Sequence, residues 1–126
     1  MSNDFLNVFL NEMKTNVNGF IAVAVTEIES GLSFGNLTID SAFDPELAAA
    51  YNLEVVKAKL NAVKALNLNQ DIEDILITLS NQIHIIDISP NKKFMIYLAA
   101  DASKANLGMT RAVLRKHKAE LEKNLA

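Results

Sequence analysis

The sequence predicts an α+β domain in which one five-stranded antiparallel sheet carries helices on both of its faces. Two observations predict this fold. Helical and strand patterns follow one another in the order α-β-β-α-β-β-β-α, and the turns between the last three strands are too short for parallel connections. Most strand candidates are also apolar on both faces: Ile75 and Ile77 point one way and Leu76 points the other. Such a sheet must be covered on both sides, and three helices are available to cover it.

Hydrophobic spacing and turn residues place the individual elements. Apolar residues from Phe5 to Met13 recur at helical spacing, which predicts a first helix over residues 4–15. Asp44, Pro45 and Glu46 start the middle helix, because aspartate caps a helix N-terminus and proline fits the first helical position. Further elements are expected as strands over residues 20–28, 33–40, 72–79, 82–88 and 94–99, as the rest of the middle helix to about residue 66, and as a final helix over residues 101–125.

Length and composition predict a single globular domain covering residues 1–126. Half of the residues are hydrophobic, and the absence of cysteine excludes a disulfide framework and a thiolate metal site. The longest nearly apolar run, residues 20–25, is far shorter than the ~20 residues that a membrane span needs. The first residues do not resemble a signal peptide. We therefore expect a cytoplasmic protein without a membrane span.

The charge is unevenly distributed along the chain. Residues 1–91 carry 4 basic and 12 acidic side chains, whereas residues 92–126 carry 8 basic and 3 acidic ones. A basic final helix could bind nucleic acid or an acidic membrane, or it could simply present a solvated face with cations near its C-terminus. We favour the solvated face and expect no nucleic-acid partner, because the helix has no aromatic residues on which bases could stack.

The middle helix has two apolar stripes, where burial of a surface helix needs only one. One stripe comprises Leu47, Tyr51, Val55, Ala58, Ala62 and Leu66. The other comprises Ala49, Leu53, Val56, Leu60 and Val63. Either stripe could face the sheet, and we assign the bulkier second one to it. The first stripe could then pair with the same helix of a second copy, or the whole helix could be more deeply buried in its own domain.

No group of residues in the sequence predicts catalysis, a metal or a cofactor. His84 and His117 have no carboxylate at ligand spacing on the same face, so both are interpreted as structural or surface residues. Asp74 and Asp87 could form an acid/base pair only if their carboxyl groups met in a cleft, and a charged edge is the simpler interpretation. The four glycines are isolated, and no serine elbow is present.

Gly108 lies inside the predicted final helix, where glycine costs roughly 1 kcal/mol relative to alanine. Small residues share its face of the helix: Ala105, Ala112 and Ala119. Such a strip lets a helix approach a neighbouring backbone closely, so Gly108 is interpreted as a packing residue.

Several segments resemble the roadblock/LC7 family. Asn106, Leu107 and Gly108, followed by an apolar residue and then Arg111 in a long final helix, are similar to its C-terminal signature. "GFIAVAV" with its glycine-containing hairpin resembles the first strand pair of the family. "ELAAAYNLEVVKAKLNAVKAL" resembles its alanine-rich central helix, and "DILITLSNQIHIIDISPNKKFMIYLAAD" its three-strand meander. The resemblance covers roughly residues 4–123 and implies a profilin-like sandwich.

The resemblance also implies a function. Roadblock domains form homodimers or heterodimers in which the central helices pack side by side and the third strands pair edge to edge. The positions that match such an interface are Ala48, Tyr51, Val55, Ala58, Ala62, Ile72, Asp74, Leu76 and Thr78. Family members regulate small Ras-like GTPases or act as scaffolds, without enzymatic activity, cofactor or catalytic arginine. The expected partners are a second copy or another roadblock-like subunit, and a Ras-like GTPase.

A second hypothesis is a sensory domain that holds a small ligand between sheet and helix. It rests on the similarity in shape between profilin-like sandwiches and sensory domains. His84 and Tyr97 are the obvious polar residues for such a pocket.

Overall fold

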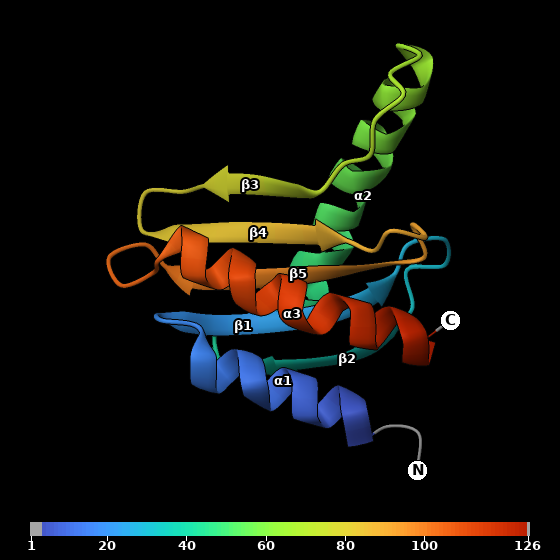
Figure 1. Cartoon of the computed structure of the whole chain (residues 1–126). Coiled ribbons are helices and arrows are strands. Elements are labelled where there is room, and N and C mark those ends of the chain that lie inside the picture. Colours follow the sequence, from blue (N-terminus) through green and yellow to red (C-terminus); the bar gives the residue numbers. More distant parts are fainter. Residues whose placement is uncertain (1–3, 126) are drawn as a thin grey trace.

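The computed structural model describes residues 4–125, which form a three-layer sandwich (Figure 1). Helices α1 (Asp4–Asn16) and α3 (Leu107–Leu125) cover one face of the sheet, and α2 (Pro45–Ala65) lies on the other. The strands are β1 (Phe20–Glu27), β2 (Ser33–Thr38), β3 (Asp74–Thr78), β4 (Gln82–Ile88) and β5 (Phe94–Asp101). The expected element order and the antiparallel sheet with helices on both faces are confirmed.

The sheet has the order β2-β1-β5-β4-β3, and all four neighbouring pairs are antiparallel. The first and last strands of this order, β2 and β3, are the edges, while β5 runs through the middle with seven of its eight residues buried. The β3–β4 hairpin brings Asp74 opposite Asp87 and Ile77 opposite His84.

Two hydrophobic clusters, one on each face of the sheet, hold the layers together. On the side of α1 and α3 the buried side chains include Phe9, Met13, Val25, Leu98 and Leu114. On the α2 side they include Ala24, Leu53, Val56, Ile86 and Tyr97. Alternate residues of β5 enter opposite clusters, which explains why its sequence is apolar without interruption.

Several predicted boundaries are wrong. Strand β3 covers residues 74–78 instead of 72–79, and β2 ends at Thr38 instead of residue 40. The final helix begins at Leu107 and not at residue 101, because β5 continues to Asp101 and a turn follows it. In that turn Asp101 Oδ1 accepts hydrogen bonds from the backbone N–H and the hydroxyl of Ser103, at 2.9 and 2.7 Å. None of the helices within residues 4–125 is both long and apolar enough to cross a membrane.

Candidate protein-interaction site

The first half of α2 is fixed on the sheet by its cap and by one apolar face. The Asp44 carboxylate accepts hydrogen bonds from the backbone N–H groups of Glu46 and Leu47, each at 3.1 Å. Ala49, Leu53 and Val56 are buried against the α2-side core. The first three residues of the bulkier stripe therefore face the sheet, as predicted, whereas Leu60 and Val63 are only partly buried.

The opposite side of α2 is an exposed apolar row. The exposed fractions are 56% for Leu47, 73% for Tyr51, 41% for Val55 and 68% for Leu66. Ala58 lies between these large side chains and is exposed as well. We call these five residues the outer row. A row of large apolar side chains on one helix face is the kind of surface that a protein partner covers.

The second half of α2 extends beyond the sheet. Figure 1 shows the helix passing the β3 edge and projecting away from the body of the domain. After Val56 no residue of α2 is buried, so the last nine residues of the helix, about 13 Å at 1.5 Å per residue, lack a full covering layer. Leu60 and Val63 line a hollow between this projecting half and the returning chain at Leu68 and Ile72. In this part of the helix Leu60 still contacts the α2-side core, but no side chain is fully buried.

Strand β3 is the sheet edge that lies beside the projecting half of α2 (Figure 1). Among the described residues it pairs with β4 alone, so its outer N–H and C=O groups have no strand partner. Leu76, Thr78 and Leu79 are exposed along it. An unpaired edge with exposed apolar side chains is a template for pairing with another strand.

The structure distributes the other predicted interface residues over different environments. Ala48 and Ile72 are half-buried against the α2-side core, and Ile72 precedes β3 instead of belonging to it. Ala62 is half-buried in the projecting half of α2. Asp74 lies in the edge strand, but its side chain is bound within the chain.

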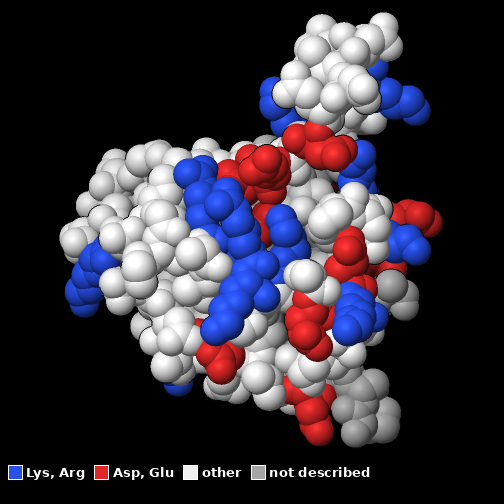
Figure 2. Space-filling model, viewed as in Figure 1, with Lys and Arg blue, Asp and Glu red and all other residues white. Residues whose placement is uncertain are grey.

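The carboxylate of Asp74 binds the guanidinium of Arg111 on α3. Nε and Nη2 of Arg111 donate to the two carboxylate oxygens, both at 2.9 Å. On the neighbouring strand, Lys118 Nζ donates to Asp87 at 2.9 Å. Figure 2 shows the basic side chains gathered over α3, with acidic side chains beside them towards β3. Neither ion pair was expected from the sequence, because the paired residues lie 37 and 31 positions apart.

The acid/base interpretation of Asp74 and Asp87 finds no support in this geometry. The two residues face each other across β3 and β4, but each carboxylate is paired with its own cation. Burial raises the pKa of Asp87, while the hydrogen bond and charge of Lys118 act in the opposite direction. Asp74 and Asp87 are thus members of a row of ion pairs between the β3–β4 hairpin and α3.

His84 and Tyr97 form a closed polar contact on the α2 side of the sheet. His84 Nε2 lies 2.8 Å from the side-chain oxygen of Gln82 and so donates to it, which leaves Nδ1 to accept from the Tyr97 hydroxyl at 3.1 Å. The Phe43 ring stacks on Tyr97 and meets the His84 ring edge to face. Burial lowers the pKa of His84 and raises that of Tyr97. Both polar groups are satisfied within the chain, so nothing here favours the small-ligand hypothesis.

His117 has a packing role, since its ring meets Phe9 at a centroid distance of 5.9 Å. No group of three or more His, Cys, Asp or Glu side chains within residues 4–125 is arranged to hold a metal ion.

The residues of the C-terminal signature have separate roles. The Asn106 side chain caps α3 by accepting a hydrogen bond from the backbone N–H of Met109 at 3.0 Å. Leu107 packs on the core, and Arg111 binds Asp74. The prediction for Gly108 is wrong: the residue is exposed, and a Cβ added to it would meet only the Asn106 side chain at 3.6 Å. Ala112 and Ala119 are exposed as well, because Leu114 and Leu121 take the buried side of α3, whereas Ala105 precedes the helix and is half-buried against the core.

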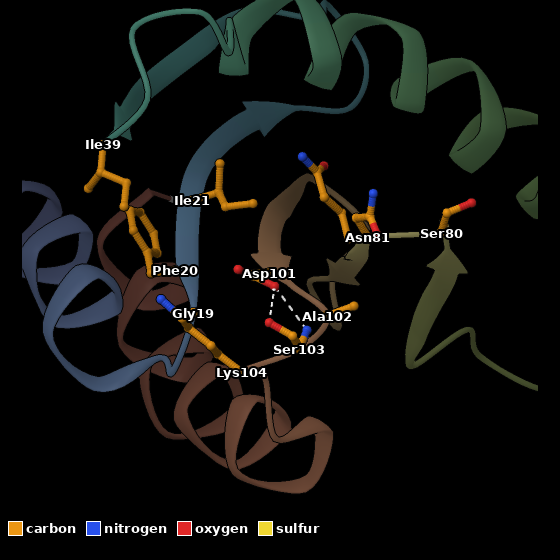
Figure 3. A pocket seen from close by; sticks show the side chains of 11 residues that line it. Gly19, Phe20, Ile21, Ile39, Ser80, Asn81, Asp101, Ala102, Ser103 and Lys104 are labelled. Carbon is orange, nitrogen blue, oxygen red and sulfur yellow. Dashed lines mark hydrogen bonds between the residues drawn. The ribbon is translucent and has the colours of Figure 1, made fainter.

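An open hollow lies at the end of the sheet where β5 passes into α3 (Figure 3). Ile21 and Ile39 form one wall, and Asn81, Asp101 and Ser103 bring polar groups to it. The bonds from Ser103 lower the pKa of Asp101, so its carboxylate stays charged. No sequence motif marks this region, because its residues come from separate segments of the chain.

The layers, the strand order and the placement of the long helix define a roadblock/LC7-type fold. The domain of known structure from Streptomyces avermitilis that bears this name superposes with a TM-score of 0.81, at 9% identity, over 94% of this chain and 95% of that chain.

Two further structures are those of MglB proteins. MglB of Myxococcus xanthus is 15% identical and has a TM-score of 0.81, with 95% of this chain and 94% of that chain covered. A structure described as MglB with a tetrameric arrangement is 14% identical and has a TM-score of 0.73, with 98% of this chain and 86% of that chain covered. At these identities the similarity establishes the fold. No family model matches the sequence, and no curated protein matches it significantly.

Proposed function

We propose that this chain is a regulatory or scaffold subunit of the roadblock/LC7 type, which acts by binding and not by catalysis. Two copies associate through α2 and β3, and the paired α2 helices present a platform to a small Ras-like GTPase. The observation that carries the proposal is the coincidence of three features on one side of the domain: the exposed outer row, the projecting half of α2 and the unpaired β3 edge.

A two-fold axis perpendicular to the sheet would satisfy all three features at once. Such an axis at β3 pairs the two edges antiparallel and keeps both α2 helices on the same face of the joined sheet. The projecting half of each α2 then lies over the neighbouring copy, where the apolar residues Leu60 and Val63 gain a covering layer. The tetrameric arrangement of the similar MglB structure supports assembly by domains of this fold.

Two observations support a binding role: the resemblance to the roadblock/LC7 family and the ion pair that Arg111 forms within the chain. Arg111 is held by Asp74 through two hydrogen bonds, so it is not poised to enter the nucleotide site of a GTPase. The MglB structures share the fold, which supports the resemblance on which the regulatory role rests. Leu47 and Leu66, which are not among the residues expected in the dimer interface, are exposed apolar side chains that a protein partner could contact.

Self-association is tested by the solution mass of the wild type and of Ala58→Glu across a dilution series. A charge buried between two helices without a partner should break the pair, so we expect a folded monomer for Ala58→Glu and a dimer for the wild type. Ala50→Glu is the matched control, since Ala50 is exposed on the same helix beside the charged residues Glu54 and Lys57. A monomeric wild type would contradict the homodimer and direct attention to a different roadblock-like subunit.

The platform is tested by binding to Ras-like GTPases loaded with GDP or with a GTP analogue. We expect the wild type and Ala50→Glu to prefer one nucleotide state, and Ala58→Glu to lose at least tenfold in affinity. Equal affinity of the dimeric protein for both states, or undiminished binding by the Ala58→Glu monomer, would contradict the platform.

A further inference from the structure

We propose that Arg111 is a positioning residue for self-association, because its guanidinium holds the edge strand β3 in the conformation that pairs with a second copy. The inference deepens the proposed function and rests on it.

Strand β3 has few attachments of its own. It is five residues long and borders β4 on one side only. On the α2 side, Ile75 and Ile77 are half-buried against the core. On the α3 side, Leu76 and Thr78 are exposed, so Asp74 is the residue of this face whose side chain is held. The strand is otherwise held by its pairing with β4 and by these two isoleucines, so the contact of Asp74 with Arg111 is its attachment to the α3 layer.

Arg111 is well placed to hold the strand because its own helix is anchored. Leu114 and Leu121, on the same helix, are each 1% exposed in the core between α3 and the sheet. The planar guanidinium binds both carboxylate oxygens of Asp74, which fixes orientation as well as distance. With exposed side-chain fractions of 33% and 16%, the pair is more shielded from water than an ordinary surface ion pair.

The neighbouring ion pairs of α3 do not duplicate this contact. Arg115 lies 3.8 Å from Glu73, both side chains are mostly exposed, and Glu73 precedes the strand. Lys118 binds Asp87 on β4, the inner neighbour of β3. Arg111 thus binds a residue of the edge strand itself, whereas Arg115, one helical turn further along α3, does not.

The charge of Arg111 also offsets repulsion between two carboxylates. Asp74 faces Asp87 directly across the hairpin, and like charges in opposed positions destabilise strand pairing. Asp74 is the first residue of β3 after a segment without regular structure, so repulsion at this position would fray the strand from its start. A frayed edge would have to be ordered before it could pair with a second copy, and that cost weakens association.

The test compares Arg111→Gln with Arg115→Gln, which remove the same charge one turn apart on the same helix. We expect the dissociation constant of the dimer, from sedimentation over a dilution series, to rise roughly tenfold for Arg111→Gln, the factor that corresponds to 1.4 kcal/mol. For Arg115→Gln it should change less than about twofold. Arg111→Lys, which keeps the charge but loses the bidentate geometry, should fall between them.

Hydrogen exchange separates positioning from a general loss of stability. In the Ala58→Glu background, Arg111→Gln should accelerate exchange of those amides of β3 that bond to β4 and leave those of β1 and β5 unchanged. Asp74→Asn combined with Arg111→Gln should recover part of the lost affinity, because it removes the repulsion.

Equal effects of Arg111→Gln and Arg115→Gln on the dissociation constant would overturn the inference, and so would unchanged exchange in β3. A wild type that is monomeric at every concentration would instead contradict the proposed homodimer. Hydrogen exchange of the β3 amides would then still show whether Arg111 holds the strand. If Arg111→Gln does not fold, Arg111→Lys is compared with the wild type instead, and an unchanged dissociation constant for that variant would overturn the inference.

Discussion

Replacing Lys118 by methionine should destabilise the domain by about 3 kcal/mol at pH 7.5, the lower end of the range for removing one partner of a buried ion pair. The Asp87 side chain is only 5% exposed, and that of Lys118 is 18% exposed, so the carboxylate would remain under α3 without its direct partner. At about 3 °C per kcal/mol for a domain of this size, the melting temperature should fall by roughly 10 °C. Urea unfolding at pH 7.5 and pH 5 measures the effect.

The stability lost in Lys118→Met should also depend on pH, which provides a second test of the ion pair. Burial already raises the pKa of Asp87, and losing the hydrogen bond from Lys118 should raise it further. A raised pKa in the folded state means that folding favours the protonated form, so the deficit of Lys118→Met should shrink as the pH falls towards 5. The double variant Asp87→Asn with Lys118→Met should lie within about 1 kcal/mol of wild type, because no charge stays buried. A pH-independent loss below about 1 kcal/mol for Lys118→Met would refute this reasoning.

Three other substitutions test separate parts of the structure. Gly19→Ala should lower the free energy of unfolding in urea by roughly 1–3 kcal/mol, because Gly19 has a φ of +76° and an added Cβ would lie 3.0 Å from a backbone oxygen. Gly108→Ala should be neutral or stabilising, and equal effects of the two substitutions would contradict the strained position of Gly19 and the open position of Gly108. Burial lowers the pKa of His84 and its neutral form accepts from Tyr97, so the wild type should lose stability as the pH falls below the ordinary histidine pKa of 6.5. His84→Gln should abolish this loss, and parallel stability profiles of the two proteins against pH would contradict the assignment. Leu76→Lys should weaken self-association at least tenfold by placing like charges near the two-fold axis, and an unchanged solution mass on dilution would count against pairing at β3.

Local patterns in the sequence were sufficient for the element order. The middle helix begins where the Asp44 cap and Pro45 predict it, because both signals act within one turn of the chain. The two apolar stripes of α2 follow from its helical period, and the bulkier stripe is the one that packs on the sheet. These features depend on neighbours that are close in the sequence.

Features that depend on the relative placement of elements were not predictable in the same way. A helical wheel shows which residues share a face but not whether that face is covered, which is why Gly108 was wrongly assigned to a packed surface. The pairing of Arg111 with Asp74 joins positions 37 apart and has no local signal. The projection of α2 beyond β3 depends on where the sheet ends, which the two stripes do not specify.

The side-by-side packing of two α2 helices is the central claim, and the absence of cysteine from the chain allows a direct measurement. One cysteine is introduced at Ala58 and, as the control, at the exposed Ala119 on α3. Each protein is treated with a short thiol-specific cross-linker at a concentration where the wild type is fully associated. We expect rapid covalent dimers for Ala58→Cys and few for Ala119→Cys. Equal and slow cross-linking of both variants would contradict the pairing of α2 with α2.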